Sequence, residues 1–397
     1  MRKLVILTAA VFVTVAGCLW ATDTRTLTMG DNNLVLLDEH NIFLFPGRII
    51  EYPNLAVGEF NSDDFRRFGI HWKFGEKKPF VVGTYFENNA PIAPDDLMGN
   101  SLVSFDLALQ DNRRINLIYG RMLGDYKFGF GLDMLHSSQT SDSPGDDSKE
   151  SFSFYDFTFS VTPEGGAFDV AVDFGLGTFT DQDAAGVDET KPNGYTEFSL
   201  LGRYFLKQNP TNVWILHAGV ALAKHGAEVY NLDATNDLDS TQSNTLTLLD
   251  AGIGLNYEPT NNVLAVADFG FQYGKIKQEN DTTNGYITTL NLSRTESWTT
   301  LPYFKIGLDA QVLHWMDIRL SATSFWDNNA TETSFSLTRS KQKTRLANNE
   351  TYLGLGFHWG NLQVDTYTDP ELFLDGLNFV SGTTNNMNFQ ISVLYRM

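Results

Sequence analysis

The sequence predicts an all-β protein, a transmembrane antiparallel β-barrel of about 16 strands. Two observations carry this prediction: apolar and polar residues alternate strictly in many segments, and the connections between these segments are long and short in turn. A third is an opening stretch typical of an exported protein. A chain of 397 residues could otherwise form two soluble domains.

The first residues have the order of a secretory signal peptide. Arg2 and Lys3 precede an uncharged, largely apolar run from Leu4 to Ala21, so we expect residues 1–21 to be cleaved on export. The string VAGC leaves open a lipoprotein site in which Cys18 is acylated, and a single membrane anchor is a further alternative. Cys18 is the only cysteine, so the cleaved chain would contain no disulfide.

The alternation is clearest in the stretches 126–134, 304–312 and 316–322, where every second residue is apolar. This period of two indicates strands with two unlike faces. No comparable helical period of 3.6 residues occurs after residue 60. In these stretches the polar face carries the charged residues Lys127, Asp133, Lys305, Asp309, Asp317 and Arg319.

The same pattern locates the other strands, of which the first four are weaker. A long polar connection follows every second strand, and the remaining strands are joined by tight turns, as at Gly360 and Asn361. Among the long connections we include Lys275–Trp298 and Asp327–Asn349. The predicted strands are 66–74, 79–86, 103–110, 113–121, 126–135, 151–161, 168–177, 195–206, 212–223, 245–257, 263–274, 299–311, 314–326, 350–359, 361–367 and 387–397.

Loops that are long at one end and short at the other are typical of outer-membrane barrels. Lipid offers no hydrogen-bond partners, so the sheet must close, with its apolar face toward lipid and its charged face toward the lumen. A secreted β-sandwich or propeller is the alternative fold. The expected location is the outer membrane of a Gram-negative (diderm) bacterium, with outer-membrane lipid as a partner.

Motifs for catalysis, cofactors and metals are absent from the sequence. The GxG strings at Gly129, Gly175, Gly252 and Gly354 lack a third glycine and open no helix, so we interpret them as lumen-side glycines in strands. No histidine pair has metal-ligand spacing and no GxSxG occurs. We therefore expect no metal, no cofactor and no enzyme activity. A barrel lipase that assembles Ser, His and Asn or Asp from separate strands stays an alternative.

The formal net charge of −20 makes nucleic acid an unsuitable partner. On the predicted lumen face, acids slightly outnumber bases. The simplest interpretation is a salt-bridged, hydrated interior, and the functional one is a lumen that selects solutes by charge, with a weak preference for cations or neutral solutes. We interpret the acidic long loops as solvated surface.

The segment after the leader, TLTMGDNNLVLLDEHNIFLFPGRI, is neither a regular strand nor a helix. Two apolar tetrads, Leu34–Leu37 and Ile42–Phe45, flank the polar string DEHN. Its layout resembles the entry segment of FadL-type outer-membrane transporters and the related PorV-like barrels. The residues that carry the resemblance are Arg25, Met29, Gly30, Asp38, Asn41 and Pro46.

The resemblance implies that this segment folds into the lumen as a hatch and that the barrel has fourteen strands, which widens our range to about 14–16. The expected domains are a signal peptide (1–21), a hatch (22–60) and a barrel (61–397). Met29, Gly30, Asp38, Asn41 and Pro46 are the expected hatch residues, and the tetrads are expected to pack together or against an apolar ligand.

The expected function is a porin-like channel that passes small or hydrophobic solutes by passive diffusion. The PorV-like alternative is a barrel that serves as a docking or carrier protein for exported proteins.

Overall fold

A computed structural model describes most of the chain. The predicted leader and the predicted strand at 103–110 lie outside the described residues. Within them, no helix has both the length and the apolar character needed to cross a membrane. The described ranges are 23–61, 66–76, 78–88, 112–140, 149–182, 188–209, 211–231, 238–284, 287–335, 338–368 and 389–397.

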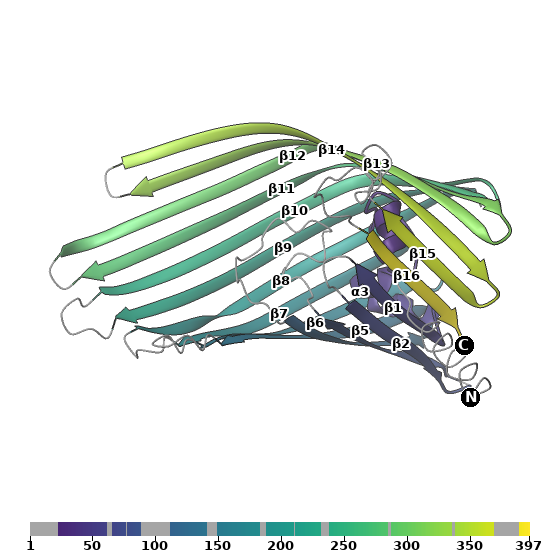
Figure 1. The fold of residues 1–397 in the computed structure, drawn as a ribbon, viewed down its shortest axis with the longest axis horizontal. Coiled ribbons are helices and arrows are strands. Elements are labelled where there is room, and N and C mark those ends of the chain that lie inside the picture. The colour runs from purple at the N-terminus through teal and green to yellow at the C-terminus, as the bar shows by residue number, and fades with distance from the viewer. Residues whose placement is uncertain are drawn as a thin grey trace, which may run out of the picture.

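Sixteen antiparallel strands in these ranges form a closed barrel, which β1 closes by pairing with both β2 and β16 (Figure 1). The strands are β1 (Leu55–Asn61), β2 (Arg66–Phe74), β3 (Phe80–Asn88), β4 (Asn112–Leu123), β5 (Tyr126–Thr140), β6 (Lys149–Pro163), β7 (Phe168–Gln182), β8 (Asp188–Asn209), β9 (Asn212–Asn231), β10 (Leu238–Thr260), β11 (Val263–Asn284), β12 (Ile287–Leu313), β13 (Met316–Phe335), β14 (Thr338–Trp359), β15 (Leu362–Thr368) and β16 (Phe389–Arg396).

The barrel is apolar outside and polar inside, as the alternation predicts. In β7, Phe174 and Leu176 are 46% and 55% exposed, whereas the neighbouring Asp169 and Asp173 are buried. The outward face of the other strands is likewise apolar across the membrane, whereas their inward face is mixed, with buried polar residues and clusters of buried apolar ones. Because closed strands leave no unpaired edge in lipid and the outward face is apolar, this is a membrane barrel.

The predicted range of strand number is confirmed, but fourteen strands is wrong. The difference lies at the N-terminus, where Leu55–Asn61 forms β1, so the boundary expected at residue 60 falls within a strand. The sequence LAVGEFN gives no signal for this strand because its glycine and mixed polarity interrupt the period of two.

Several predicted long loops are also wrong. The segments 275–298 and 327–349 belong mostly to the paired strands β11–β12 and β13–β14. Strands β8 to β14 are 20 to 27 residues long and extend far beyond the short β1, β2, β15 and β16 (Figure 1). Parts of their distal halves, such as 278–284 and 338–345, are polar on both faces, and such sequences look like loops.

The tight turns and the C-terminal end of the chain lie at one end of the barrel, opposite the distal halves of the long strands (Figure 1). Short turns at one end and long excursions at the other are the organisation of bacterial outer-membrane barrels, whose short turns are periplasmic. The protein is therefore an outer-membrane barrel of a Gram-negative bacterium.

Candidate functional site

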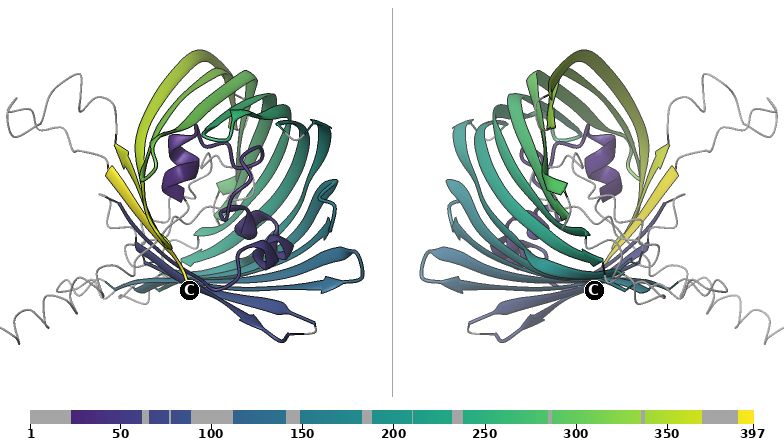
Figure 2. Two further views of the ribbon diagram at one scale, coloured as in Figure 1. Left: turned by 90° about the vertical axis from the view of Figure 1, so that its right-hand side faces the viewer. Right: turned by 90° about the vertical axis from the view of Figure 1, so that its left-hand side faces the viewer.

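The N-terminal segment lies within the ring of strands (Figure 2). It contains helix α2 (Asp23–Thr28), helix α3 (Asn41–Leu44) and the 3₁₀ helix η1 (Pro46–Glu51). Gly30 and Asp31, with φ of 83° and 54°, turn the chain after α2, and Pro46 begins η1, where its fixed φ is favourable. We call residues 23–54 the lumenal segment.

One contact between the lumenal segment and the wall is built around Asp309 on β12. Arg25 Nε in α2 lies 3.3 Å from Asp309 Oδ2, and Arg319 Nε on β13 lies 3.0 Å from the same oxygen. Arg319 is almost completely buried and also pairs with Asp365 on β15 and Asp317 on its own strand. The predicted lumen residues Asp309, Asp317 and Arg319 thus form one network, which Arg25 of the segment joins.

A second contact is centred on Asp169 on β7. Arg48 Nη2 in η1 lies 3.0 Å from Asp169 Oδ2, and Arg203 Nε on β8 lies 2.6 Å from it. Arg203 also donates to the Leu34 carbonyl oxygen at 3.2 Å and to Asn41 Oδ1 at 2.6 Å. One buried wall arginine therefore holds both the segment backbone and a predicted hatch residue. Our sequence-based site missed this contact.

The other predicted lumen charges differ in their partners. Lys127 pairs with Glu51 of η1, and Lys305 Nζ donates to the Asp31 carbonyl oxygen at 2.7 Å. Asp133 instead pairs within the wall, with Arg114 Nε at 3.1 Å.

The predicted hatch residues are buried in the lumenal segment. Met29 is fully buried beside Val35 and Leu36 against the wall. Asp38 accepts a hydrogen bond from Thr26 Oγ1 at 3.3 Å. Asn41 and Pro46 lie at the starts of α3 and η1.

The two apolar tetrads pack against each other and against the wall. Leu34 of the first meets Leu44 and Phe45 of the second, together with the wall residues Ala171 and Leu201. Their mutual packing was one of the two expected arrangements.

Wall glycines make room for the segment backbone. A Cβ at Gly129 on β5 would lie 1.8 Å from the Gly47 nitrogen, and one at Gly307 on β12 would lie 2.6 Å from the Met29 carbonyl oxygen. Both distances are below any normal contact. The interpretation of strand glycines as lumen-side spacers is confirmed for Gly129, which was chosen from the sequence.

Burial also alters two carboxyl groups in the lumenal segment. It raises the pKa of Asp38, and it raises the pKa of Glu39 to about 7. The charge of Asp38 raises the pKa of Glu39 further, whereas Arg25 opposes the shift. Glu39 is therefore a titratable group close to neutral pH.

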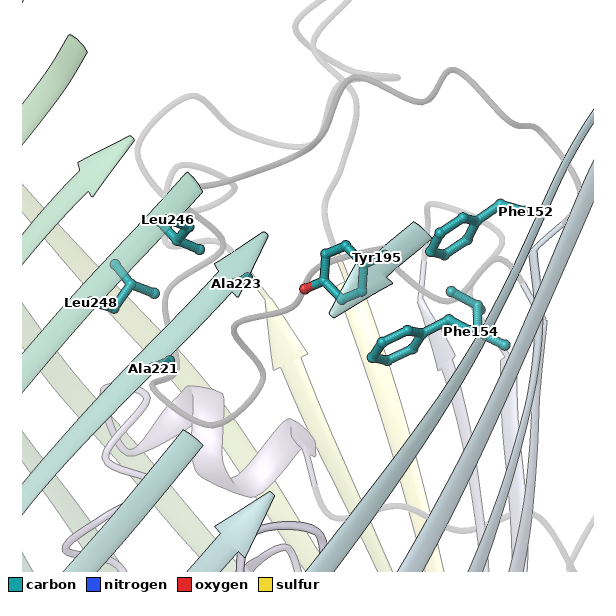
Figure 3. Packing of buried hydrophobic residues seen from close by; sticks show 8 residues of the cluster. Phe152, Phe154, Tyr195, Ala221, Ala223, Leu246 and Leu248 are labelled. Carbon is teal, nitrogen blue, oxygen red and sulfur yellow. The ribbon is translucent and has the colours of Figure 1, made fainter. Parts of the chain in front are cut away.

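Beyond the lumenal segment, the inner wall carries an apolar patch, which we call the apolar wall patch. Figure 3 shows Phe152, Phe154 and Tyr195 on one side of it and the aliphatic residues Ala221, Ala223, Leu246 and Leu248 on the other. The Tyr195 ring lies edge to face with both Phe rings, with its centroid 5.2 Å from that of Phe154, whereas the Phe152 and Phe154 rings are stacked. We predicted polar residues on this face, so our prediction missed the patch. The sequence does contain a signal for it, because Phe152, Phe154 and Tyr195 are apolar residues at lumen-facing positions of their strands. Its members are Leu135, Phe152, Phe154, Tyr195, Ala221, Ala223, Leu246 and Leu248.

One histidine and one serine form a pair on the outer face. His136 Nδ1 and Ser153 Oγ are 3.0 Å apart. Among the described residues no hydrogen bond orients the other ring nitrogen of His136, so this pair lacks the third group that a hydrolytic triad uses.

No protein-family model and no curated protein matches the sequence. Among solved structures, the chain is similar to the toluene transporter TodX of Pseudomonas putida, with 9% identity, a TM-score of 0.40, and coverage of 96% of this chain and 99% of that one. It is also similar to the ferric yersiniabactin uptake receptor FyuA of Yersinia pestis (12% identity, TM-score 0.39, coverage 86% and 79%). TM-scores this low establish no common fold, so the architecture rests on the strand pairing above.

Proposed function

We propose that the protein is an outer-membrane transporter that passes small or hydrophobic solutes by passive diffusion. In this proposal, residues 1–21 are a cleaved signal peptide, the chain from residue 22 to the start of β1 is a hatch, and the rest is the channel wall. No reaction is catalysed. Selection depends on the width of the lumen, its charge and its apolar lining.

The observation that carries the proposal is the way the lumenal segment contacts the wall. In addition to its apolar packing, the lumenal segment makes polar contacts with three wall residues, Asp169, Asp309 and Lys305. The pair of Arg25 with Asp309 is partly exposed, with side chains 22% and 11% exposed, so water can solvate its separated charges at modest cost. Such contacts suit a segment that docks and undocks.

The apolar wall patch supports a hydrophobic solute. It places three aromatic rings, of Phe152, Phe154 and Tyr195, on the inner wall. Ligand sites are lined mainly by hydrophobic and aromatic side chains with a few polar groups. The Tyr195 hydroxyl donates to Glu197 Oε2 at 2.6 Å and adds one polar group at its margin.

Solute uptake into liposomes tests the transport proposal. Vesicles that contain the refolded full chain should admit an alkane or a small sugar faster than empty vesicles. Substitution of Phe154 by Ser, which makes the apolar wall patch more polar, should slow alkane uptake and leave ion uptake unchanged. Uptake equal to that of empty vesicles for every solute, by protein shown to be folded, would contradict a transporter.

A further inference from the structure

A row of basic residues occupies the distal half of β14, far from the lumenal segment. Arg339, Lys341, Lys343 and Arg345 alternate with polar neighbours, and all four are exposed. Figure 1 shows β13 and β14 continuing well past the short β15. The row is unusual in a chain whose net charge is −20.

These residues project from the outer face of the barrel. In the lower half of β14, Gly354 contacts Thr28 of the lumenal segment and so faces the lumen, whereas Leu353 pairs with Leu320, which is 52% exposed outside. The pairing of β13 with β14 runs without a register shift from Met316 to Phe335. Odd-numbered residues of β14 therefore face outward throughout, in phase with Leu353.

The row begins where the lipid-facing band ends. At the periplasmic end the rings of Phe357 and Trp359 stack, and at the other end the exposed Trp326 pairs with Ala347. Phe357 and Ala347 are ten residues apart on β14. At about 3.4 Å per residue and a strand tilt near 40°, this separation spans about 25 Å along the membrane normal. This is the height of the apolar band of an outer-membrane barrel, with aromatic residues at both interfaces.

Other strands repeat the transition from apolar to basic. On β11, Lys275 and Lys277 follow the outward-facing Tyr273, and on β9, Lys224 follows Leu222. Arg66 and Arg113 occupy the same position on β2 and β4. Among described residues with placed side chains, the outer face beyond the apolar band carries two acids, Glu279 and Glu332. Its bases, which we call the basic girdle, are Arg66, Arg113, Lys224, Lys275, Lys277, Arg339, Lys341, Lys343 and Arg345.

The two acids neutralise only part of the basic girdle. Glu332 pairs with Arg339 and Lys341, and Glu279 pairs with Lys277. Within the described part of the chain, Lys275, Lys343 and Arg345 have no ion pair. Three exposed cations next to the lipid boundary therefore have no anionic partner among the described residues.

We propose that the basic girdle binds the phosphorylated headgroups of the outer-leaflet lipid, of the lipid A type. The girdle continues the lipid-facing surface at headgroup height, so an anionic lipid can place its acyl chains on the apolar band and its phosphates on the cations. Arginine and lysine both bind phosphate, and arginine can do so with two parallel hydrogen bonds. An acidic protein partner would not require the girdle to begin at the lipid boundary.

The test uses the full chain in nanodiscs of phosphatidylcholine that contain either lipid A or its dephosphorylated form. Lipid retained after mild extraction is measured by native mass spectrometry. The wild type should retain lipid A in preference to the dephosphorylated form. The triple variant Lys275→Gln, Lys343→Gln, Arg345→Gln should bind lipid A more weakly, by about fivefold for each charge removed.

A matched control removes three basic residues from the lumen-facing phase at the periplasmic end: Lys73→Gln, Lys207→Gln and Arg396→Gln. Both triple variants must migrate as folded barrels on unboiled gels, and the control should retain lipid A like the wild type. Equal retention of the two lipids by the wild type would overturn the proposal. So would a girdle variant that keeps its lipid A but loses binding to an acidic polypeptide such as polyglutamate, because that result assigns the face to a protein partner.

Discussion

Arg25 of helix α2 and Asp309 of strand β12, 284 positions apart in the chain, lie 3.3 Å apart inside the barrel. This contact joins the lumenal segment to an ion-pair network of the wall. Asp309 keeps a partner in that network even without Arg25, since it also pairs with Arg319 at 3.0 Å. Loss of Arg25 therefore removes a link to the segment without leaving Asp309 unpaired.

Substitution of Arg25 by Ala should loosen α2 and leave the barrel folded. A hydrogen bond between charged groups contributes about 1.5–3 kcal/mol, so amide exchange in residues 24–30 should rise about tenfold or more. Exchange measured by mass spectrometry checks this. Arg294→Ala, which removes an exposed pair with Glu296, is the control. Unchanged exchange in α2 would show that Arg25 does not hold the segment.

Substitution of Gly129 by Ala should displace η1 from the wall. The added Cβ would lie 1.8 Å from the Gly47 nitrogen, a backbone atom that cannot rotate away. We expect faster amide exchange in residues 46–51 and a higher channel conductance. Gly165→Ala is the matched control, because a Cβ there meets no atom within 4 Å. If the two variants behave alike, the close approach of η1 to the wall is not important for docking.

Docking of the lumenal segment should weaken as the pH rises through about 7. Burial raises the pKa of Glu39 from 4.5 to about 7, with Asp38 and Asp365 adding to the shift and Arg25 opposing it. A carboxyl whose pKa is raised on docking binds its proton more tightly in the docked state. Its contribution is therefore most favourable below pH 4.5 and is lost as the pH rises through about 7.

Conductance measured as a function of pH checks this prediction. The wild-type conductance should rise as Glu39 ionises, and Glu39→Gln should remove most of the rise. Because the pKa of Asp38 is also raised by burial, the double variant with Asp38→Asn should be flat. A dependence that persists in the double variant would assign it to other groups.

A disulfide between the segment and the wall should lock the lumen. The hydroxyls of Thr24 in α2 and Ser392 on β16 are in direct contact, so cysteines at these positions can bridge. If the segment moves during transport, the oxidised Thr24→Cys, Ser392→Cys variant should lose solute uptake and regain it on reduction. Each single-cysteine variant is a control. Uptake that is equal in the oxidised and reduced double variant would mean that the α2 end stays in place.

The sequence predicts the wall better than what fills it. Lys127 and Asp309 were placed in the lumen by alternation alone, because one face of a membrane strand must be apolar. The partnership of Arg48 with Asp169 was not predictable: Arg48 lies in an irregular segment with no period, and the two residues meet only when the barrel closes. The apolar wall patch reverses the expected polarity beyond the lumenal segment, where packing replaces hydration.

The most direct test of the proposed hatch is the conductance in planar bilayers of the wild type and of a variant that lacks residues 22–53. If the lumenal segment obstructs the channel, the deletion should give a larger and less variable conductance, with a barrel that still migrates as folded on unboiled gels. Equal conductance of the two folded proteins would contradict the account.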